Sequence, residues 1–288
     1  MKPLRSVLYM PSSNSRALEK ARTIPADAII FDLEDAVAPD AKELARDQAC
    51  AAVVSGEYDG KTLTIRCNGL DTPWGAADLR AAAAAGPAAV VVPKVSGVEH
   101  LQAVVELVGT TPIWAMIETP VAVFDVRAIA AHPRVAALVL GTNDLAKELR
   151  AALVPGRAPL LPHLATALLA GREAGKVVLD GVYNDVKDLV GFEAECQQGK
   201  ELGFDGKTLI HPTQVEIANR VWAPSADEIG RARAVIEAFT VAEAEGRGVV
   251  VVDGRMVENL HRDNALHTLA TAEAIAALGQ DAAGPLRT

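Results

Sequence analysis

Eight short apolar runs recur between residues 6 and 211, and segments with helical patterns separate them. The runs are rich in valine and isoleucine and lie at residues 6–10, 28–33, 63–67, 89–94, 113–118, 137–141, 177–182 and 207–211. Apolar strands joined by helices form a parallel sheet that is covered on both faces. Eight of them over this length predict an α/β fold in which the sheet closes into a (β/α)8 TIM barrel rather than staying open.

The pattern changes at about residue 224. A helical segment, "ADEIGRARAVIEAFTVAEAEG", is followed by the β-like run "GVVVVDG" and by a second long helical segment. These elements are surplus to eight strand–helix units. We therefore expect a barrel domain at residues 1–223 and a C-terminal extension of helices and a β-hairpin at residues 224–288.

Charge, cysteine content and missing motifs exclude several classes of function. The formal net charge is −9, so binding to nucleic acid or to a membrane surface is not expected. The three cysteines form no C-x-x-C motif, which disfavours a zinc site or a disulfide framework and favours the cytoplasm. No apolar run suits a signal peptide or a membrane span. G-x-S-x-G, P-loop and G-x-G-x-x-G motifs are missing, so serine-hydrolase, NTPase and dinucleotide-binding functions lack support.

Polar and ionisable residues follow most of the predicted strands. The carboxyl ends of barrel strands meet at one rim, where TIM-barrel enzymes carry their chemistry. The residues at these ends are Asp32, Glu34, Asp35, Arg66, Asn68, Lys94, Glu118, Gly141 to Asp144, Asp180, Tyr183 and His211. Their coincidence predicts a functional site at that rim.

Two carboxylates on neighbouring strands are candidate metal ligands. Glu118 directly follows four apolar residues, and a buried carboxylate there needs a cation. Asp144, with Asn143 before it, precedes a helical pattern, so either residue could be a metal or substrate ligand or only the N-cap of that helix. The backbone N–H groups of "GTN" at the helix start also suit a substrate carboxylate. Mg²⁺ takes one or two protein carboxylates and fills its other positions with water and substrate oxygens.

The stretch "FDLED" places three carboxylates within four positions, at Asp32, Glu34 and Asp35. We expect a divalent ion and its waters beside them, with Arg66 or Lys94 nearby, to make this cluster tolerable. Residues 32 and 34 share a strand face and 35 points away, so one of the three is expected to be a cap or loop group outside the site. Arg66, directly after a core strand, suits binding of a carboxylate or a developing enolate better than a surface ion pair.

Several segments in chain order resemble one family. They are "SVLYMPSSNSRALEKA", "ADAIIFDLEDAVAPDAKELAR", "IRCNGLDTPWG", "PKVSG", "IETP", "LGTNDL", "GFDGKTLIHPTQ" and "DGRMVENLH", which span about residues 4 to 262. Together they resemble the citrate lyase β-subunit-like (CitE-like) proteins of the HpcH/HpaI aldolase family. "GTNDLAKEL", "DGVYN" and "VENLH" are most similar to the malyl-CoA-type enzymes, including the (3S)-malyl-CoA thioesterase branch.

The resemblance implies a cytoplasmic, Mg²⁺-dependent TIM barrel, with Mn²⁺ as the alternative ion, that assembles as a homotrimer or hexamer. Glu118 and Asp144 correspond to the metal ligands. Arg66 corresponds to the arginine that contacts substrate and enolate, and residues 141–143 (Gly141, Thr142 and Asn143) to the segment that binds the substrate carboxylate. The stretch with Asp32, Glu34 and Asp35 corresponds to groups around the metal's waters, and Asp35 is the member expected to act in catalysis.

The resemblance also implies what the C-terminal extension does. In related lyases it covers a neighbouring subunit's site as a lid and supplies a catalytic aspartate, and Glu258 stands at that position here. Lys42 and Arg46 have i, i+4 helical spacing and could meet the phosphates of coenzyme A, although a solvated basic face explains the spacing equally well.

Three functions follow from the resemblance. The first is a lyase that splits a β-hydroxyacyl-CoA, such as malyl-CoA, citramalyl-CoA or citryl-CoA, into an acyl-CoA and glyoxylate, pyruvate or oxaloacetate. The second is a (3S)-malyl-CoA thioesterase that releases malate and coenzyme A. The third is a citrate lyase β-type subunit that needs partner subunits and acts on a carrier-bound thioester. No histidine ends the second strand, which argues against the pyruvate aldolase branch.

Overall fold

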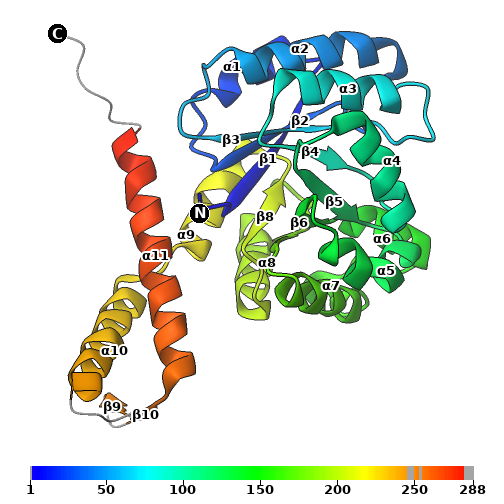
Figure 1. Ribbon diagram of the computed structural model, residues 1–288. Coiled ribbons are helices and arrows are strands. Elements are labelled where there is room, and N and C mark those ends of the chain that lie inside the picture. The colour runs from blue at the N-terminus through cyan, green and yellow to red at the C-terminus, as the bar shows by residue number, and fades with distance from the viewer. Residues whose placement is uncertain (1, 245–249, 253–254, 282–288) are drawn as a thin grey trace, which may run out of the picture. The chain divides into compact units, whose positions relative to one another are not determined.

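The computed structural model describes residues 2–244, 250–252 and 255–281. Eight parallel strands form a closed barrel in chain order, and the last pairs with the first (Figure 1). They are β1 (Ser6–Pro11), β2 (Ala28–Asp32), β3 (Thr62–Arg66), β4 (Ala89–Val92), β5 (Ile113–Ile117), β6 (Val135–Leu140), β7 (Val177–Asp180) and β8 (Gly206–Leu209). The predicted (β/α)8 barrel is confirmed, and each predicted strand end lies within about two residues of the observed one, the usual scatter of such boundaries.

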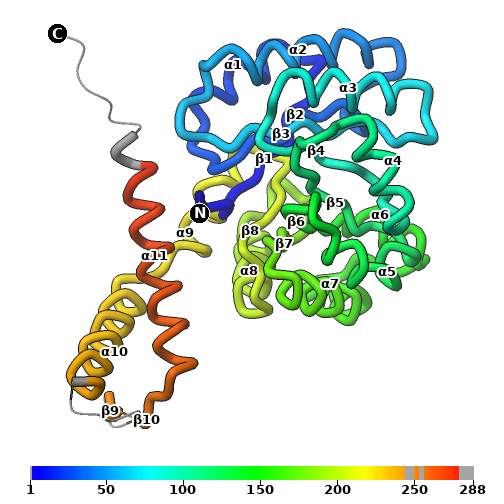
Figure 2. The backbone as a smooth tube through the Cα atoms, viewed as in Figure 1, coloured from blue at the N-terminus to red at the C-terminus, as the bar shows by residue number. Residues whose placement is uncertain are grey.

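Helices follow the strands and surround the barrel, as the backbone trace in Figure 2 shows. They are α1 (Ser15–Ala21), α2 (Lys42–Val54), α3 (Gly75–Ala85), α4 (Val98–Val108), α5 (Pro120–Ala131), α6 (Thr142–Leu149), α7 (Leu161–Glu173), α8 (Leu189–Leu202) and α9 (Val215–Trp222), with short 3-10 turns η1 (Pro39–Ala41), η2 (Pro155–Arg157) and η3 (Pro212–Gln214). Among the described residues, no helix is long and apolar enough to cross a membrane.

The strands carry two separate apolar clusters because their side chains alternate between the two faces of the sheet. One cluster joins strand residues such as Leu8, Ile29 and Ile65 to the surrounding helices. The buried members of the other come from strands alone and fill the barrel interior; they include Val7, Ile30, Val91, Met116, Val139 and Leu179. Residues two positions further along each strand therefore also point inward, toward the carboxyl-end rim.

The chain divides into two compact units, one of which is Leu4–Trp222. The other joins the N-terminal residues up to Pro3 to the segment that begins at Ala223, and it contains α10 (Ala226–Ala244), β9 (Val250–Val252), β10 (Arg255–Val257) and α11 (Asn259–Asp281). β9 and β10 pair as an antiparallel hairpin. Residues of both helices and of the hairpin form a separate small core, including Phe239, Val250 and Ala265. The extension therefore has its own packing.

Candidate active site

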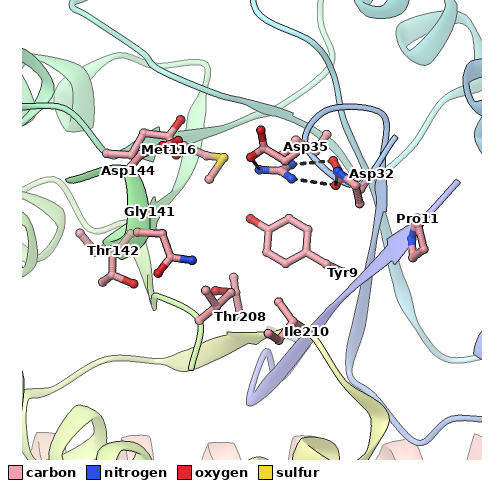
Figure 3. Close-up of a pocket in the computed structure, with 16 residues that line it drawn as sticks. Tyr9, Pro11, Asp32, Asp35, Met116, Gly141, Thr142, Asp144, Thr208 and Ile210 are labelled. Carbon is pink, nitrogen blue, oxygen red and sulfur yellow. Dashed lines mark hydrogen bonds and ion pairs between the residues drawn. The ribbon is translucent and has the colours of Figure 1, made fainter. Parts of the chain in front are cut away.

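Successive side chains of a strand point to opposite faces, and this alternation brings four polar side chains to the inward-facing rim. Tyr9, Asp32, Arg66 and Glu118 stand two positions beyond Val7, Ile30, Thr64 and Met116, respectively. A cavity of about 440 Å³ opens there, and Figure 3 shows residues that line it. Eight of the residues singled out in the sequence line this cavity: Asp32, Asp35, Arg66, Glu118, Gly141, Thr142, Asn143 and Asp144. The barrel thus gathers most of the rim residues around one space.

Arg66 holds the acidic cluster together. It ends β3 directly opposite Asp32 of β2, and its Nε and Nη2 lie 2.6 and 2.7 Å from the two oxygens of Asp32. Nη1 lies 2.7 Å from Glu34 Oε2 and 3.4 Å from Asp35 Oδ2. One guanidinium therefore contacts all three carboxylates. Asp35, although exposed, lines the cavity and reaches Arg66, whereas Glu34 contacts Arg66 without belonging to the cavity lining, so the expectation that one of the three stands outside the site stays a prediction.

Lys42 fixes the loop that carries these carboxylates. The Lys42 ammonium donates to the carbonyls of Leu33 and Glu34 and to Oδ1 of Asn68, each at 2.7 Å. Its side chain is buried. Arg46, one turn later, pairs with Asp78 at 3.4 Å. The phosphate-binding alternative is therefore wrong for Lys42, whose three N–H donors all have partners within the barrel unit.

Glu118 is a buried carboxylate held at one oxygen. It follows β5, is 2% exposed, and accepts the backbone N–H of Lys94 at 2.6 Å through Oε1. A Cβ atom at position 141 would stand 2.3 Å from Glu118 Oε2, so only glycine leaves room for this carboxylate. Burial, together with the charge of Glu34, raises the pKa of Glu118 to about 8. Burial likewise raises the pKa of Glu34 to about 7. A carboxylate with so little compensation suits a cation at its free oxygen.

Asp144 lies across the cavity from Asp32 (Figure 3). It is the third residue of α6, whose N-cap is Gly141, and no side chain caps this helix. The N-cap alternative is therefore wrong for both Asn143 and Asp144. The Asn143 amide instead exchanges hydrogen bonds of 3.0 and 2.7 Å with Asn184. The half-buried Asp144 carboxylate remains open to the cavity.

Glu118 and Asp144, which both line the cavity, are the residues that would hold a magnesium ion. The charge of Asp144 raises the pKa of Glu118, so the two carboxylates share one electrostatic environment. No group of three or more His, Cys, Asp or Glu side chains in the described residues is arranged to hold a metal. Two oxygen ligands agree with a hard ion that keeps water and substrate in its other positions, and argue against zinc.

Other strand-end residues lie outside the cavity lining. Asp180 is fully buried between Lys207 Nζ at 2.9 Å and Arg157 Nη1 at 2.6 Å. The His211 side chain caps η3 by accepting the Thr213 N–H through Nδ1. Tyr9, in contrast, lines the cavity although the sequence indicated only an apolar strand there. Tyr9 is two residues after Val7 and therefore points to the same face of the strand, which is the signal that could have identified it.

Glu258 lies in the C-terminal unit. It directly precedes α11, its side chain is exposed, and its backbone N–H donates to His261 Nδ1 at 3.0 Å. Its carbonyl accepts the N–H groups of His261 and Arg262 in the first turn of that helix. Its catalytic role stays a prediction.

The TIM barrel and its rim cavity agree with the result of the comparison with known protein families. The model of the HpcH/HpaI aldolase/citrate lyase family matches residues 5–212. The chain belongs to this family.

Particular relatives narrow the comparison. A (3S)-malyl-CoA thioesterase of Cereibacter sphaeroides is 52% identical over 277 residues, covering 96% of this chain and 97% of the relative. The citrate lyase subunit beta of Escherichia coli is 34% identical over 281 residues, covering 93% of each. CitE of Mycobacterium tuberculosis, solved in complex with magnesium, acetoacetate and coenzyme A, has a TM-score of 0.78 at 27% identity, covering 94% of this chain and 98% of that chain.

Proposed function

We propose that this protein is a Mg²⁺-dependent enzyme that hydrolyses a β-hydroxyacyl-CoA of the malyl-CoA type to a hydroxy acid and coenzyme A. The observation that carries the proposal is the pair Glu118 and Asp144 beside Arg66 in a single cavity. The thioesterase relative at 52% identity favours hydrolysis. The citrate lyase relatives support the second candidate, cleavage of the carbon–carbon bond by the same site.

Glu118 and Asp144 would hold the ion, which supplies charge neutralisation and polarises a substrate oxygen. The backbone N–H groups of Gly141, Thr142 and Asn143, at the start of α6, would receive the substrate carboxylate. Arg66 would place positive charge beside the oxygen that becomes negative during the reaction. The Asp35 carboxylate, exposed to the cavity, would direct water toward the thioester carbon and take its proton.

In the lyase alternative, the bond between the hydroxyl-bearing carbon and the acyl-CoA portion breaks. The Asp35 carboxylate would take the hydroxyl proton, a keto acid forms, and the electron pair of the broken bond passes to the enolate of the acyl-CoA. Glu258, from the C-terminal extension, would return a proton to the enolate carbon. We expect this extension to act as a lid over a neighbouring subunit in a homotrimer or hexamer.

Product analysis separates the candidates. Purified protein is incubated with (3S)-malyl-CoA and Mg²⁺, with and without EDTA, and the products are identified by mass spectrometry. Malate and free coenzyme A, lost with EDTA, are the expected products. Glyoxylate and acetyl-CoA as products would instead show that the protein cleaves the carbon–carbon bond. No turnover of malyl-CoA would overturn the proposal for this substrate, and citramalyl-CoA and citryl-CoA would then be compared in the same assay.

A further inference from the structure

Tyr9 projects its phenol into the middle of the cavity. It lies on β1 at the inward-facing position above Val7, and its ring packs against the interior cluster of strand residues. Figure 3 shows its hydroxyl directed into the space between Asp32 on one side and Asp144 and Thr142 on the other. The side chain thus has an apolar base and a polar tip that faces the site where substrate would bind.

The Tyr9 hydroxyl differs from the other two tyrosine hydroxyls of the chain. Tyr58 donates to the Leu18 carbonyl at 2.9 Å, and Tyr183 donates to Asp188 Oδ2 at 2.7 Å. Within the described residues, Tyr9 has no such partner, and its contact is the Arg66 guanidinium, 4.8 Å from the ring centroid. The Tyr9 hydroxyl is therefore open to the cavity and can donate a hydrogen bond to a molecule bound there.

Arg66 alone has little capacity to bind substrate. Its guanidinium carries five N–H donors. Two contact Asp32, and Nη1 contacts both Glu34 and Asp35, so four contacts already involve carboxylates. Arg66 therefore supplies positive charge but at most one free N–H group toward the cavity. A second donor next to it would complete a site for a negatively charged oxygen.

Burial raises the pKa of Tyr9, against the opposite effect of Arg66, so the phenol stays protonated. A protonated phenol is a hydrogen-bond donor and not a base. Thr208, from β8, is another neutral hydroxyl in the cavity lining, but it donates to the Asp180 carbonyl at 3.0 Å. Tyr9 is thus an open hydroxyl donor, and it stands beside the Arg66 guanidinium.

We propose that Tyr9 is a catalytic residue whose hydroxyl donates a hydrogen bond to the thioester carbonyl oxygen of the substrate while that oxygen becomes negative. The inference rests on the proposed function and deepens it. In hydrolysis the charge develops as water adds to the carbonyl carbon, and in carbon–carbon cleavage it develops as the enolate forms. In both reactions Tyr9 keeps its proton. The Arg66 guanidinium, which packs against the Tyr9 ring, places its positive charge close to the same oxygen.

The test compares Tyr9→Phe with the matched variants Tyr183→Phe and Tyr58→Phe, each of which also loses one hydroxyl. A donor whose hydrogen bond strengthens in the transition state affects kcat more than KM. We expect Tyr9→Phe to lower kcat for malyl-CoA by about 100-fold, as removal of one oxyanion-binding donor does in other enzymes, with little change in KM. Mg²⁺ affinity by calorimetry and the melting temperature should stay at the wild-type values. Tyr183→Phe should retain wild-type kcat, and so should Tyr58→Phe once its stability is taken into account.

A binding measurement keeps the inference separate from the choice of reaction. Carboxymethyl-CoA carries a carboxylate where an acyl-CoA enolate carries its charged oxygen, and its affinity can be measured for each variant without turnover. Binding about 10-fold weaker to Tyr9→Phe than to the wild type is expected, as for loss of one hydrogen bond to a charged group. Equal binding, an unchanged kcat, or a parallel loss of Mg²⁺ affinity would overturn the role of Tyr9. If the wild type neither turns over malyl-CoA nor binds carboxymethyl-CoA, the proposed function fails as well.

Discussion

Replacement of Lys42 by methionine tests whether this side chain holds the acidic loop in place. The ammonium contacts three acceptors at 2.7 Å, but they are not equally dependent on it. The Leu33 carbonyl would keep the Asn68 amide at 3.0 Å, and the Glu34 carbonyl would keep the Val37 N–H at 3.1 Å. Oδ1 of the buried Asn68 would lose its hydrogen-bond partner.

The magnitude follows from this count. One buried acceptor left without a partner costs about 1–3 kcal/mol, and two weakened carbonyl contacts add a smaller amount. The loss of stability for Lys42→Met should therefore be about 2–4 kcal/mol, partly offset because a buried ammonium no longer has to be desolvated. In a unit of this size each kcal/mol lowers the melting temperature by about 2–4 °C. The expected decrease is about 5–10 °C on that scale.

Thermal unfolding followed by circular dichroism measures this effect, with Lys187→Met as the control. Lys187 is exposed, and its side chain makes no hydrogen bond or ion pair within the described residues. The control should melt within about 1 °C of the wild type, as surface substitutions do. Residual activity of Lys42→Met below its melting temperature should also fall, because Glu34 and Asp35 would no longer be aligned on Arg66. A melting temperature equal to that of the control would refute the positioning role of Lys42.

Three further changes test other parts of the site. Gly141→Ala places a Cβ atom 2.3 Å from Glu118 Oε2. Overpacking of this kind costs about 1–3 kcal/mol, so Mg²⁺ binding measured by calorimetry should weaken by about 10-fold or more. In the control Gly230→Ala, the new Cβ meets no atom within 4 Å, and Mg²⁺ should bind as in the wild type. In Arg66→Lys, the ammonium group cannot contact three carboxylates as the planar guanidinium does, so kcat/KM should fall by about 100-fold. A variant that keeps at least half of the wild-type kcat/KM would contradict this role. Burial alone would raise the pKa of Asp180, but Lys207 and Arg157 hold this pKa below its usual value. The stability that Asp180 contributes is therefore fully present above the unfolded-state pKa of about 4, and it is lost as pH falls through the lower folded-state pKa. Asp180→Asn should flatten this acid-side decrease in urea unfolding, and an unchanged pH profile would refute the assignment.

Much of the barrel could be predicted because its signal is local. Each apolar strand is a continuous run, and the helical segments between the runs are long enough to distinguish. Asp32 and Arg66 end neighbouring strands in the sequence, and the structure places them in direct register. Side chains alternate along each strand, and the strand ends of a parallel barrel meet at one rim. Several cavity residues can therefore be identified from the sequence alone.

The remaining features depend on contacts that the sequence does not display. Lys42 has the spacing of a solvated helix face, and its burial arises from a loop nine residues earlier that folds back over it. Tyr9 reads as one more apolar strand residue, because the apolar run around it hides the face to which it points. Asp144 is two residues inside the helix rather than before it, and a shift of this size at a helix start is below the precision of sequence patterns.

The central claim is that Glu118 and Asp144 form one magnesium site at the barrel rim. Calorimetric titration of Mg²⁺ into the wild type, Glu118→Gln and Asp144→Asn tests it directly, with Glu173→Gln, an exposed carboxylate paired with Arg127, as the control. We expect one ion to bind per chain in the wild type and the control, and no measurable binding in the other two variants. Wild-type affinity in Glu118→Gln or Asp144→Asn would contradict it.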